Sequence, residues 1–423
     1  MFEKHSLGSL VERQLGGGTP ERNNPQFWNG PVPWASVKDF TDDQLTLNST
    51  EESITEQGLA ASSTNLIPAG TPLVCTRMAV GRCSIANHDV AINQDVKALV
   101  PKENVSPKYL LRLLDSLKFR AESVAVGSTV KGIRISDLLS IQTPVAPSDE
   151  QSKIAQILDT LDTQIQKTEA LIAKLEKIKE GLLHGLLTRG IGHNGQLRPT
   201  PEQAPELYKT SALGLIPNTW KATSVGELGT WRGGSTPSKS TPKFWPSHGL
   251  LWVSPKDLSQ DTIETTEDKV SELAARVTNL TMFPPGTVLV VFRSGILRRK
   301  LPVVKVVKCF TVNQDIKALM PAEAVSKEFV HYLLQGHAKC ILNSSLKAGT
   351  TVESLDFRFF SSYRIPLPPV EEQEIIVERF RSLENRLAEE KKLVEKLKIK
   401  KVGLMDDLLT GQVRVTPLLK DAG

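Results

Sequence analysis

The sequence predicts an α+β protein with two homologous globular α/β modules, each followed by a long α-helix. Three observations predict this fold. A set of sequence blocks occurs twice in the same order, and each set is followed by a helical segment with a 3.5-residue apolar repeat. A segment rich in Gly, Pro, Gln and Asn separates the two copies, as a linker would. We expect the two helices to pair, because their apolar positions match.

The modules are defined by an internal repeat with an offset of about 216 to 222 residues. Residues 17–20, Gly-Gly-Thr-Pro, return as 234–237, Gly-Ser-Thr-Pro, and the run Asn-Gln-Asp-Val-Lys-Ala-Leu at 93–99 returns at 313–319 with Ile for Val. The other paired blocks are Phe27-Trp28 with Phe244-Trp245, Trp34 and Lys38-Asp39 with Trp252 and Lys256-Asp257, 70–77 with 286–293, 127–130 with 349–352, and 144–151 with 366–373. These blocks predict a shared scaffold. The diverged segments between them predict surface loops with different specificities, or simple drift after duplication.

The helical segments have apolar residues at steps that alternate between four and three. Such a spacing over about five heptads indicates a left-handed coiled-coil seam rather than an ordinary amphipathic helix. We expect this seam at Ile154, Leu158, Leu161, Ile165, Ile172 and Leu175, and at Ile376, Phe380, Leu383, Leu387, Val394 and Leu397. Polar residues interrupt it at matching places, Thr168 with Glu390 and Lys179 with Lys401. They predict positions that fix the register, or an exposed kink with no pairing role.

Prolines and glycines that flank the helical segments define the expected boundaries. Each helix follows a Pro-x-x-Pro stretch and ends at Leu-Leu-Thr close to a glycine. A helix of roughly 40 residues is about 60 Å long, which suits a spacer. The expected parts are a first module at 1–147, a spacer helix at 148–191, a linker at 192–218, a second module at 219–370, a second helix at 371–412 and a tail at 413–423.

Composition excludes several classes of protein. The net charge of +5 on 423 residues implies only weak average attraction to polyanions. There is no membrane-helix stretch and no signal-peptide pattern at the start, so we expect a cytoplasmic protein. The four cysteines lack the spacing of a disulfide framework or a zinc site, and we expect buried thiols. Neither an Asn-Pro-Pro-Tyr-like methyltransferase motif nor a Gly-x-x-x-x-Gly-Lys phosphate loop is present. Pro255-Lys256-Asp257 resembles a nuclease motif only superficially.

With these motifs, the chain resembles the specificity subunits of type I restriction-modification systems. The resemblance rests on the Gly-Gly-Thr-Pro entry, the Asn-Gln-Asp run and the Pro-x-x-Pro-x-x-Glu-Gln junction in both halves, and it covers about residues 5 to 412. The family alternates a target-recognition domain with a helical spacer, twice. Leu215-Ile216-Pro217 with Trp220 resembles the family's opening of the second module, whereas the first module starts almost at Met1 without that segment.

The resemblance implies a non-catalytic subunit that recognises double-stranded DNA for a larger enzyme. Two target-recognition domains would each recognise half of a bipartite, asymmetric site. The helices, packed as an antiparallel coiled coil with pseudo-two-fold symmetry, would set the gap and dock two modification (methyltransferase) subunits. Restriction/translocase subunits would join them. No cofactor is expected in this chain, since S-adenosylmethionine, ATP and magnesium would be bound by partner subunits. The rival hypotheses are an enzyme with an unfamiliar active site and a coiled-coil scaffold that binds no DNA.

Basic residues near the module loops are the best candidates for DNA contact. The stretch 286–308 contains several Arg and Lys residues and no acid. The candidates are Arg77, Arg82, Lys131 and Arg134 in the first module, and Arg293, Arg298, Arg299 and Lys300 in the second. The Gly127-Ser128-Thr129 turn could offer amides and hydroxyls to a phosphate. For each residue the alternative is a solvated surface charge. Trp28, Trp34, Trp245 and Trp252 could stack on bases, but repeated scaffold positions favour the core.

Overall fold

The computed structural model describes residues 1–42, 44–127, 130–347 and 352–422. The chain divides into two compact units, each with one module and a part of both long helices. Unit 1 contains Met1–Ala170 and Lys391–Gly423, and unit 2 contains Leu171–Glu390. None of the helices formed by the described residues has the length and apolar composition of a membrane-spanning segment.

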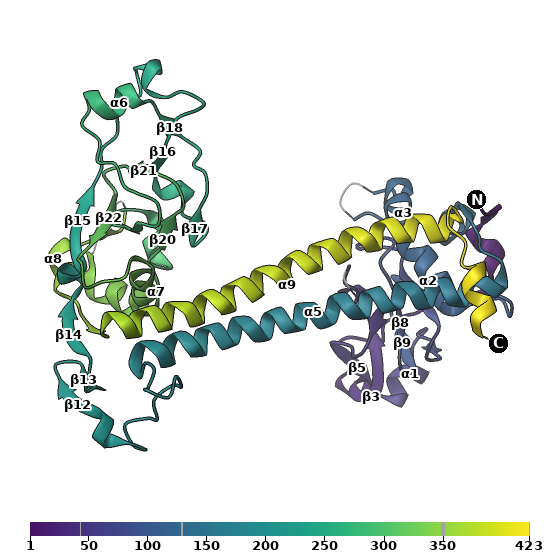
Figure 1. The fold of residues 1–423 in the computed structure, drawn as a ribbon. Helices are drawn as coiled ribbons and strands as arrows, with labels where there is room; N and C mark the ends of the chain where they lie inside the picture. Colours follow the sequence, from purple (N-terminus) through teal and green to yellow (C-terminus); the bar gives the residue numbers. More distant parts are fainter. Residues whose placement is uncertain (43, 128–129, 348–351, 423) are drawn as a thin grey trace. The chain divides into compact units, whose positions relative to one another are not determined.

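Unit 1 has two main sheets and one strand pair (Figure 1). Its strands are β1 (Lys4–Ser6), β2 (Val11–Leu15), β3 (Trp28–Ala35), β4 (Thr46–Leu47), β5 (Glu52–Ile54), β6 (Leu66–Ile67), β7 (Pro72–Cys75), β8 (Cys83–Ala86), β9 (Val90–Ile92), β10 (Val96–Pro101) and β11 (Gln142–Pro144). The five-stranded sheet has the order β2-β10-β7-β8-β4, and the four-stranded sheet has the order β5-β3-β9-β6. The antiparallel pair of β1 with β11 joins the two ends of the module.

Unit 2 repeats the five-stranded sheet and the closing strand pair, but its second sheet has three strands. Its strands are β12 (Tyr208–Ser211), β13 (Gly214–Pro217), β14 (Lys221–Ser224), β15 (Gly229–Gly233), β16 (Leu250–Val253), β17 (Thr262–Ile263), β18 (Lys269–Val270), β19 (Val288–Val291), β20 (Val303–Val306), β21 (Phe310–Val312), β22 (Ile316–Pro321), β23 (Leu346–Lys347), β24 (Ser354–Leu355) and β25 (Arg364–Leu367). The order β15-β22-β19-β20-β17 matches the five-stranded sheet of unit 1, and β14 pairs with β25 as β1 pairs with β11. The three-stranded sheet has the order β18-β16-β21. The repeated sequence blocks therefore correspond to a repeated scaffold.

Helices cover these sheets and close the cores. The short helices are α1 (Glu56–Ala60), α2 (Pro107–Ser116), α3 (Lys118–Val124), α4 (Ile135–Ser140), α6 (Glu272–Val277), α7 (Lys327–Ser345) and α8 (Phe357–Ser362). Ser106 and Ser326 cap α2 and α7 by accepting a backbone N–H three residues later, which satisfies one free donor at each helix start. Tyr109 and Leu110 of α2, and Phe329 and Leu333 of α7, are fully buried in the cores.

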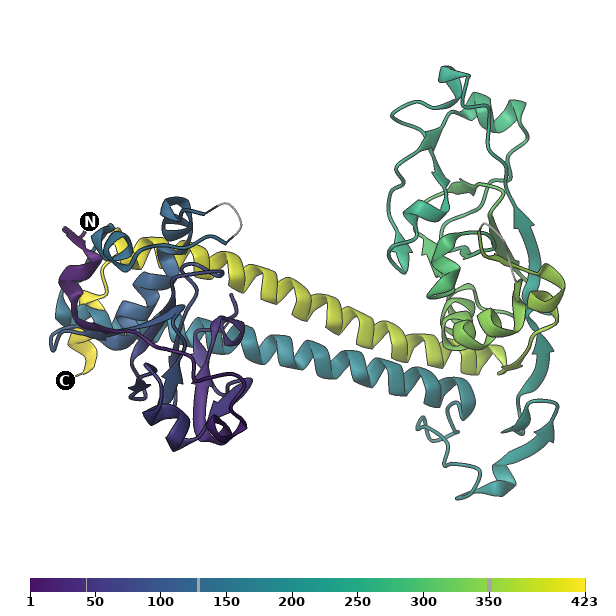
Figure 2. The same cartoon turned by 180° about the vertical axis from the view of Figure 1, so that it is seen from behind.

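The long helices are α5 (Ser148–Thr188) and α9 (Val370–Thr410), of 41 residues each. In unit 1, Leu161 and Ile165 of α5 form an apolar cluster with Leu397 of α9, so the first part of α5 packs on the last part of α9. In unit 2, Leu186 of α5 shares a core with Phe380, so the last part of α5 packs near the first part of α9. The two helices lie side by side in each unit and run antiparallel (Figures 1 and 2).

Two sequence expectations need refinement. The segment expected as a linker contains structure, because β12 and β13 form an antiparallel hairpin there. Of the thiols expected to be buried, Cys75 and Cys83 are buried, but Cys309 and Cys340 are exposed. The expectation was wrong for these two because Cys309 lies in the turn between β20 and β21, and Cys340 lies on the solvent-exposed side of α7.

Candidate nucleic-acid interface

A tight turn stands at the same place in both modules, at the start of β10 and of β22. We call residues 93–95 and 313–315 the NQD turns. In each, the asparagine side chain accepts the backbone N–H of the aspartate two residues later, at 3.1 Å for Asn93 and 3.0 Å for Asn313. The asparagine N–H bonds the carbonyl of Ala35 in unit 1 and of Val253 in unit 2. These bonds explain why the run is repeated, since the side chain replaces backbone partners that a turn lacks.

The glycine-rich entry of each module packs against its NQD turn. Thr19 donates its hydroxyl to Oε1 of Gln94 at 2.6 Å, and Thr236 donates to Gln314 at the same distance. Gly17 lies so close to the backbone carbonyls of residues 92 and 93 that a Cβ would have no room there. Residues 16–20, which follow β2, and residues 233–237, which begin at the last residue of β15, are called the GGTP loops. Glycine is required because only its backbone allows this close approach.

A third loop, after β7 in unit 1 and after β19 in unit 2, meets the same turn. Thr76 donates its N–H to the carbonyl of Asp95 at 2.8 Å, and Phe292 donates to Asp315 at 2.7 Å. The guanidinium of Arg77 lies 3.6 Å from the Asp95 carboxylate. β2 and β7 end where β10 begins, because β10 is antiparallel to both. Three loops therefore gather at one end of each five-stranded sheet.

Three of the four basic candidates in the first module lie together at this end of the sheet. Arg77, Lys131 and Arg134 are exposed, and Met78 donates its N–H to the carbonyl of Lys131 at 3.0 Å. Arg82 differs, because both sides of its guanidinium bind Asp42, at 2.8 and 3.1 Å. Bonds from Lys118 and Arg82 hold the pKa of the Asp42 carboxyl below its ordinary value. Arg82 is thus engaged in holding a loop of the module.

The candidates of the second module occupy the corresponding loop. Arg293, Arg299 and Lys300 are exposed, whereas Arg298 forms an ion pair with Glu353. In the repeat, Glu353 and Asp356 stand where the first module has Lys131 and Arg134. The same surface therefore has different charges in the two modules. Of the predicted Gly-Ser-Thr turn, Ser128 and Thr129 lie outside the described residues, as do positions 348–351 in the second copy.

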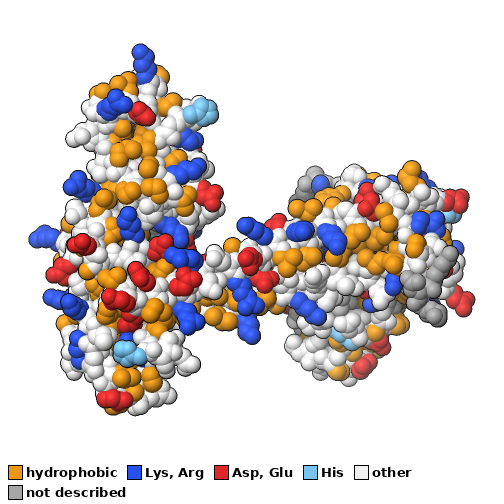
Figure 3. Space-filling model, in the orientation of Figure 1, with side chains coloured by type: hydrophobic (Ala, Val, Ile, Leu, Met, Phe, Trp, Pro, Cys, Tyr) orange, Lys and Arg blue, Asp and Glu red, His pale blue; other side chains and the backbone are white. Residues whose placement is uncertain are grey.

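Charge alone does not outline an interface. On the face that Figure 3 shows, the Lys and Arg side chains of unit 2 are interspersed with Asp and Glu side chains. Local basic density does not select the polar residues of the NQD turns and the start of the next strand, which are Gln94, Lys97, Gln314 and Lys317. Their signal was present in the sequence, because they are polar residues within the most strongly repeated run.

The four repeated tryptophans form two matching clusters. Trp28 meets Trp34 edge-to-face at 5.2 Å, and Trp245 meets Trp252 at 5.0 Å. A cation covers each pair: the Arg22 guanidinium lies 4.1 Å from the Trp28 ring centre, and the Lys239 ammonium lies 3.7 Å from that of Trp245. Their rings are therefore occupied within the module, which favours the core interpretation over base stacking.

Most of the predicted seam residues are buried, but they fall into different surroundings. Those in the apolar core shared with a module are Ile154, Leu158, Ile376 and Phe380. Leu161, Ile165 and Leu397 form a separate cluster between the helices, and Leu175, Leu387 and Val394 are also buried. Ile172 and Leu383 are half-buried. At the polar interruptions, Lys179 pairs with Glu384 at 2.8 Å and Lys401 with Asp162 at 2.7 Å.

The Glu-Gln pair at the start of each long helix binds other segments of the same unit. Gln151 accepts the N–H of Ser106 at 2.9 Å and so joins α5 to α2. Glu150 binds the Arg414 guanidinium and accepts the N–H of Val415 at 3.1 Å. The hydrogen bond from Arg414, which outweighs desolvation, holds the pKa of Glu150 below its ordinary value.

The second copy repeats this arrangement with different residues. Glu372 accepts two bonds from the Arg198 guanidinium, one from the Ile191 N–H at 2.8 Å and one from the Trp220 indole at 3.0 Å. Each glutamate therefore holds the chain that follows the other long helix. We call these two arrangements the glutamate clasps.

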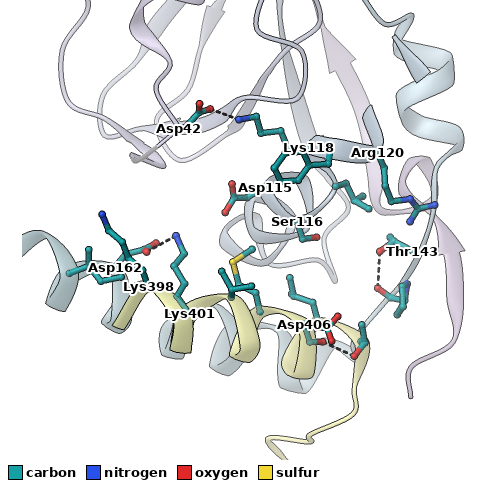
Figure 4. Close-up of a pocket in the computed structure, with 18 of the residues that line it drawn as sticks. Asp42, Asp115, Ser116, Lys118, Arg120, Thr143, Asp162, Lys398, Lys401 and Asp406 are labelled. Carbon is teal, nitrogen blue, oxygen red and sulfur yellow. Dashed lines mark hydrogen bonds and ion pairs between the residues drawn. The ribbon is translucent and has the colours of Figure 1, made fainter. Parts of the chain in front are cut away.

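A groove of about 640 Å³ lies in unit 1 between α2, α3 and the two long helices (Figure 4). The residues that line it include the Lys401–Asp162 ion pair and the strongly exposed Phe119 and Val402. Burial raises the pKa of the Asp115 carboxyl, which also lines the groove. Within the described residues there is no cluster of three or more potential metal ligands. The groove therefore has the chemistry of a contact surface, with apolar residues among fixed charges.

The sequence of this chain is similar to those of one protein family. A family model described as the type I restriction modification DNA specificity domain matches residues 1–177 and 217–398. The MjaIX specificity subunit of Methanocaldococcus jannaschii is 25% identical over 413 residues, which cover 95% of this chain and 91% of that protein. The EcoR124I/EcoR124II specificity subunit of Escherichia coli is 34% identical over 173 residues, only 40% of this chain and 42% of that protein.

Solved structures show the same fold. The S subunit of a type I restriction-modification system from M. genitalium has a TM-score of 0.57 at 16% identity, and the match covers 97% of this chain and 96% of that one. A chain from work on complex assembly and conformational transition of the type I R-M system has a TM-score of 0.58 at 16% identity, over 97% and 98% of the two chains. At this identity the likeness concerns the fold.

Proposed function

Because this chain belongs to the type I restriction-modification DNA specificity family, in which the subunit recognises DNA and does not catalyse, we propose that its two modules each recognise one half of a bipartite, asymmetric DNA site. One observation supports this most strongly. The loops at the two sheet ends share one hydrogen-bonded frame but differ in charge, with Lys131 and Arg134 in one module and Glu353 and Asp356 in the other. Equivalent frames with different side chains suit two different half-sites.

The long helices act as the spacer that sets the gap between the half-sites. Each has 41 residues, a length of about 60 Å at the rise of an α-helix. The seam clusters and the two lysine–acid pairs favour a fixed antiparallel register over sliding. A rigid pair of helices suits a DNA site in which a fixed number of base pairs separates the two recognised halves.

The same helices dock two modification subunits. Apolar side chains lie exposed on them: Ile399 and Val402 of α9 are 73% and 71% exposed, on neighbouring positions of one helix face. In unit 1 this surface continues into the groove beside Phe119. Exposed apolar residues rimmed by charges are typical of a protein interface. Restriction/translocase subunits complete the complex, and S-adenosylmethionine, ATP and magnesium belong to these partners, with no cofactor in this chain.

The test exchanges parts of the chain and maps methylated DNA in cells that also express the modification subunits. Replacing residues 225–365 with the same segment of another specificity subunit should change one half of the methylated motif and leave the other half unchanged. Deleting one heptad from both helices keeps the seam in phase, shortens the pair by about 10 Å, and should shorten the gap by about three base pairs. A swap that alters both halves at once, or a deletion that leaves the gap unchanged, would refute the proposal.

Two rivals predict other results. An enzyme with an unfamiliar active site would methylate or cut DNA as the purified chain alone. A coiled-coil scaffold without DNA binding would fail to bind any duplex even with modification subunits present, and substituting Val402 by Glu would then release a partner without any effect on DNA.

A further inference from the structure

We propose that each module has a DNA-phosphate site at its NQD turn, formed by the glutamine of the turn, the lysine three residues later and the GGTP loop. In unit 1 the site consists of Gln94, Lys97 and residues 16–20, and in unit 2 of Gln314, Lys317 and residues 233–237. Its ligand is a phosphodiester group of duplex DNA. This inference rests on the proposed function, because it requires that the modules bind DNA.

The glutamine is held in one orientation in both units. Thr19 donates to Oε1 of Gln94, and Thr236 to Oε1 of Gln314, so each amide oxygen is turned toward its GGTP loop. The amino group, which has two hydrogens, then remains as a donor on a side chain that is exposed in both modules. An oriented, exposed donor fits an acceptor-only ligand such as a phosphate oxygen.

The lysine lies against the same loop. Nζ of Lys97 is 2.9 Å from the position that a Cβ on Gly16 would occupy, and Nζ of Lys317 is 3.9 Å from that of Gly233. Lys317 also lies 4.9 Å from the ring centre of Phe357. Among the described residues, no ion pair joins either lysine to a carboxylate. Within the described part of the chain, each site thus has a positive charge that no carboxylate pairs with.

The repetition of these residues identifies the ligand as backbone and not as base. Neighbouring loops differ between the modules, whereas the threonine, glutamine and lysine are the same. A contact shared by two modules with different specificities carries no sequence information, and phosphate contacts have that property: they position the protein on the duplex. The two sites would set each sheet end at the same place on its half-site, so that the variable loops meet the base edges.

The experiment measures DNA affinity of the full chain in complex with its modification subunits, by fluorescence anisotropy over a series of salt concentrations. One duplex contains the methylated motif and the other is unrelated. Lys97→Gln should reduce the slope of log K against log salt by about 0.9, and Lys97→Gln with Lys317→Gln by about 1.8. Gln94→Glu keeps an acceptor for Thr19 but removes the donor, and should weaken binding to both duplexes by about tenfold.

Lys102→Gln is the matched control, since Lys102 follows the opposite end of β10 and should leave the slope unchanged. Lys317→Gln tests the site independently in unit 2 if a unit 1 variant fails to fold. The inference is overturned if wild type binds but the variants keep its affinity and slope, or if the losses occur on one sequence only. If the wild-type complex binds neither duplex, the proposed function itself fails, and this inference fails with it.

Discussion

Replacing Lys179 with methionine should destabilise the protein more than replacing Lys401, although the two lysines occupy matching seam positions. Lys401 bonds Asp162, which is also held by the Arg112 guanidinium at 2.5 Å. Lys179 bonds Glu384, whose other hydrogen-bond donor is the Tyr332 hydroxyl, and Lys305 acts on this carboxylate only as a more distant charge. The Lys401 variant therefore leaves a carboxylate that still bonds a guanidinium, whereas the Lys179 variant leaves one that bonds only a hydroxyl.

The structure sets the magnitude. The side chains of Lys179 and Glu384 are 27% and 28% exposed, and their charged atoms are 2.8 Å apart. At an effective dielectric constant of about 20 their direct attraction is about 6 kcal/mol, and desolvation of the two ions cancels most of it. We expect Lys179→Met to lower the free energy of unfolding by about 2 kcal/mol and Lys401→Met by less than about 1 kcal/mol.

Urea unfolding followed by circular dichroism measures both values, with Lys177→Met on the exposed face of α5 as the control. Burial raises the pKa of Glu384, but bonds from Lys179 and Tyr332 outweigh it and hold that pKa below its ordinary value. The stabilisation is therefore complete above the unfolded pKa of about 4.3 and is lost as the pH falls through the folded pKa. The difference in the free energy of unfolding between wild type and Lys179→Met should therefore become smaller at acid pH. Equal losses for the two lysine variants would refute this reasoning.

Other predictions concern the cores and clasps. Phe380→Ala removes a fully buried ring and should cost about 3 to 5 kcal/mol in urea unfolding, and a loss below about 1 kcal/mol would contradict its placement. Burial lowers the pKa of His331 to about 4, so wild type should lose up to about 3 kcal/mol between about pH 6.5 and 4. The free energy of unfolding of His331→Gln, measured over the same pH range, should not show this loss. Glu372→Gln should weaken the bonds from Arg198 and Trp220 and expose residues 190–200 to limited proteolysis; unchanged cleavage would argue against the clasp.

Sequence patterns predicted the fold because its main signals are periodic or repeated. The repeat defined two equivalent modules, and the family match and the sheet orders confirm them. The 3.5-residue spacing of residues such as Leu161 and Leu397 indicated helices that pair, and these two residues do form one cluster. Periodicity could not show that Ile154 and Phe380 also belong to module cores, because that depends on how α2 and α7 pack on the helices.

The candidate interface was less predictable. Local basic density selected Arg77 and Arg293, which are exposed, together with Arg82 and Arg298, whose guanidinium groups bind Asp42 and Glu353. Those partners lie 40 and 55 residues away in sequence, so no local pattern reveals them. The glutamate clasps were hidden for the same reason. The Pro-x-x-Pro-x-x-Glu-Gln motif can be recognised in the sequence. The groups that bind its glutamate, however, come from the segment that follows the other long helix.

The most direct test of the central claim is single-molecule methylation mapping of DNA from cells that express this chain with its modification subunits. The proposed function predicts a methyladenine motif with two dissimilar halves and a gap of fixed length, and this motif should vanish when the chain is deleted. A short motif without a gap, or methylation that persists in the deletion strain, would contradict the account.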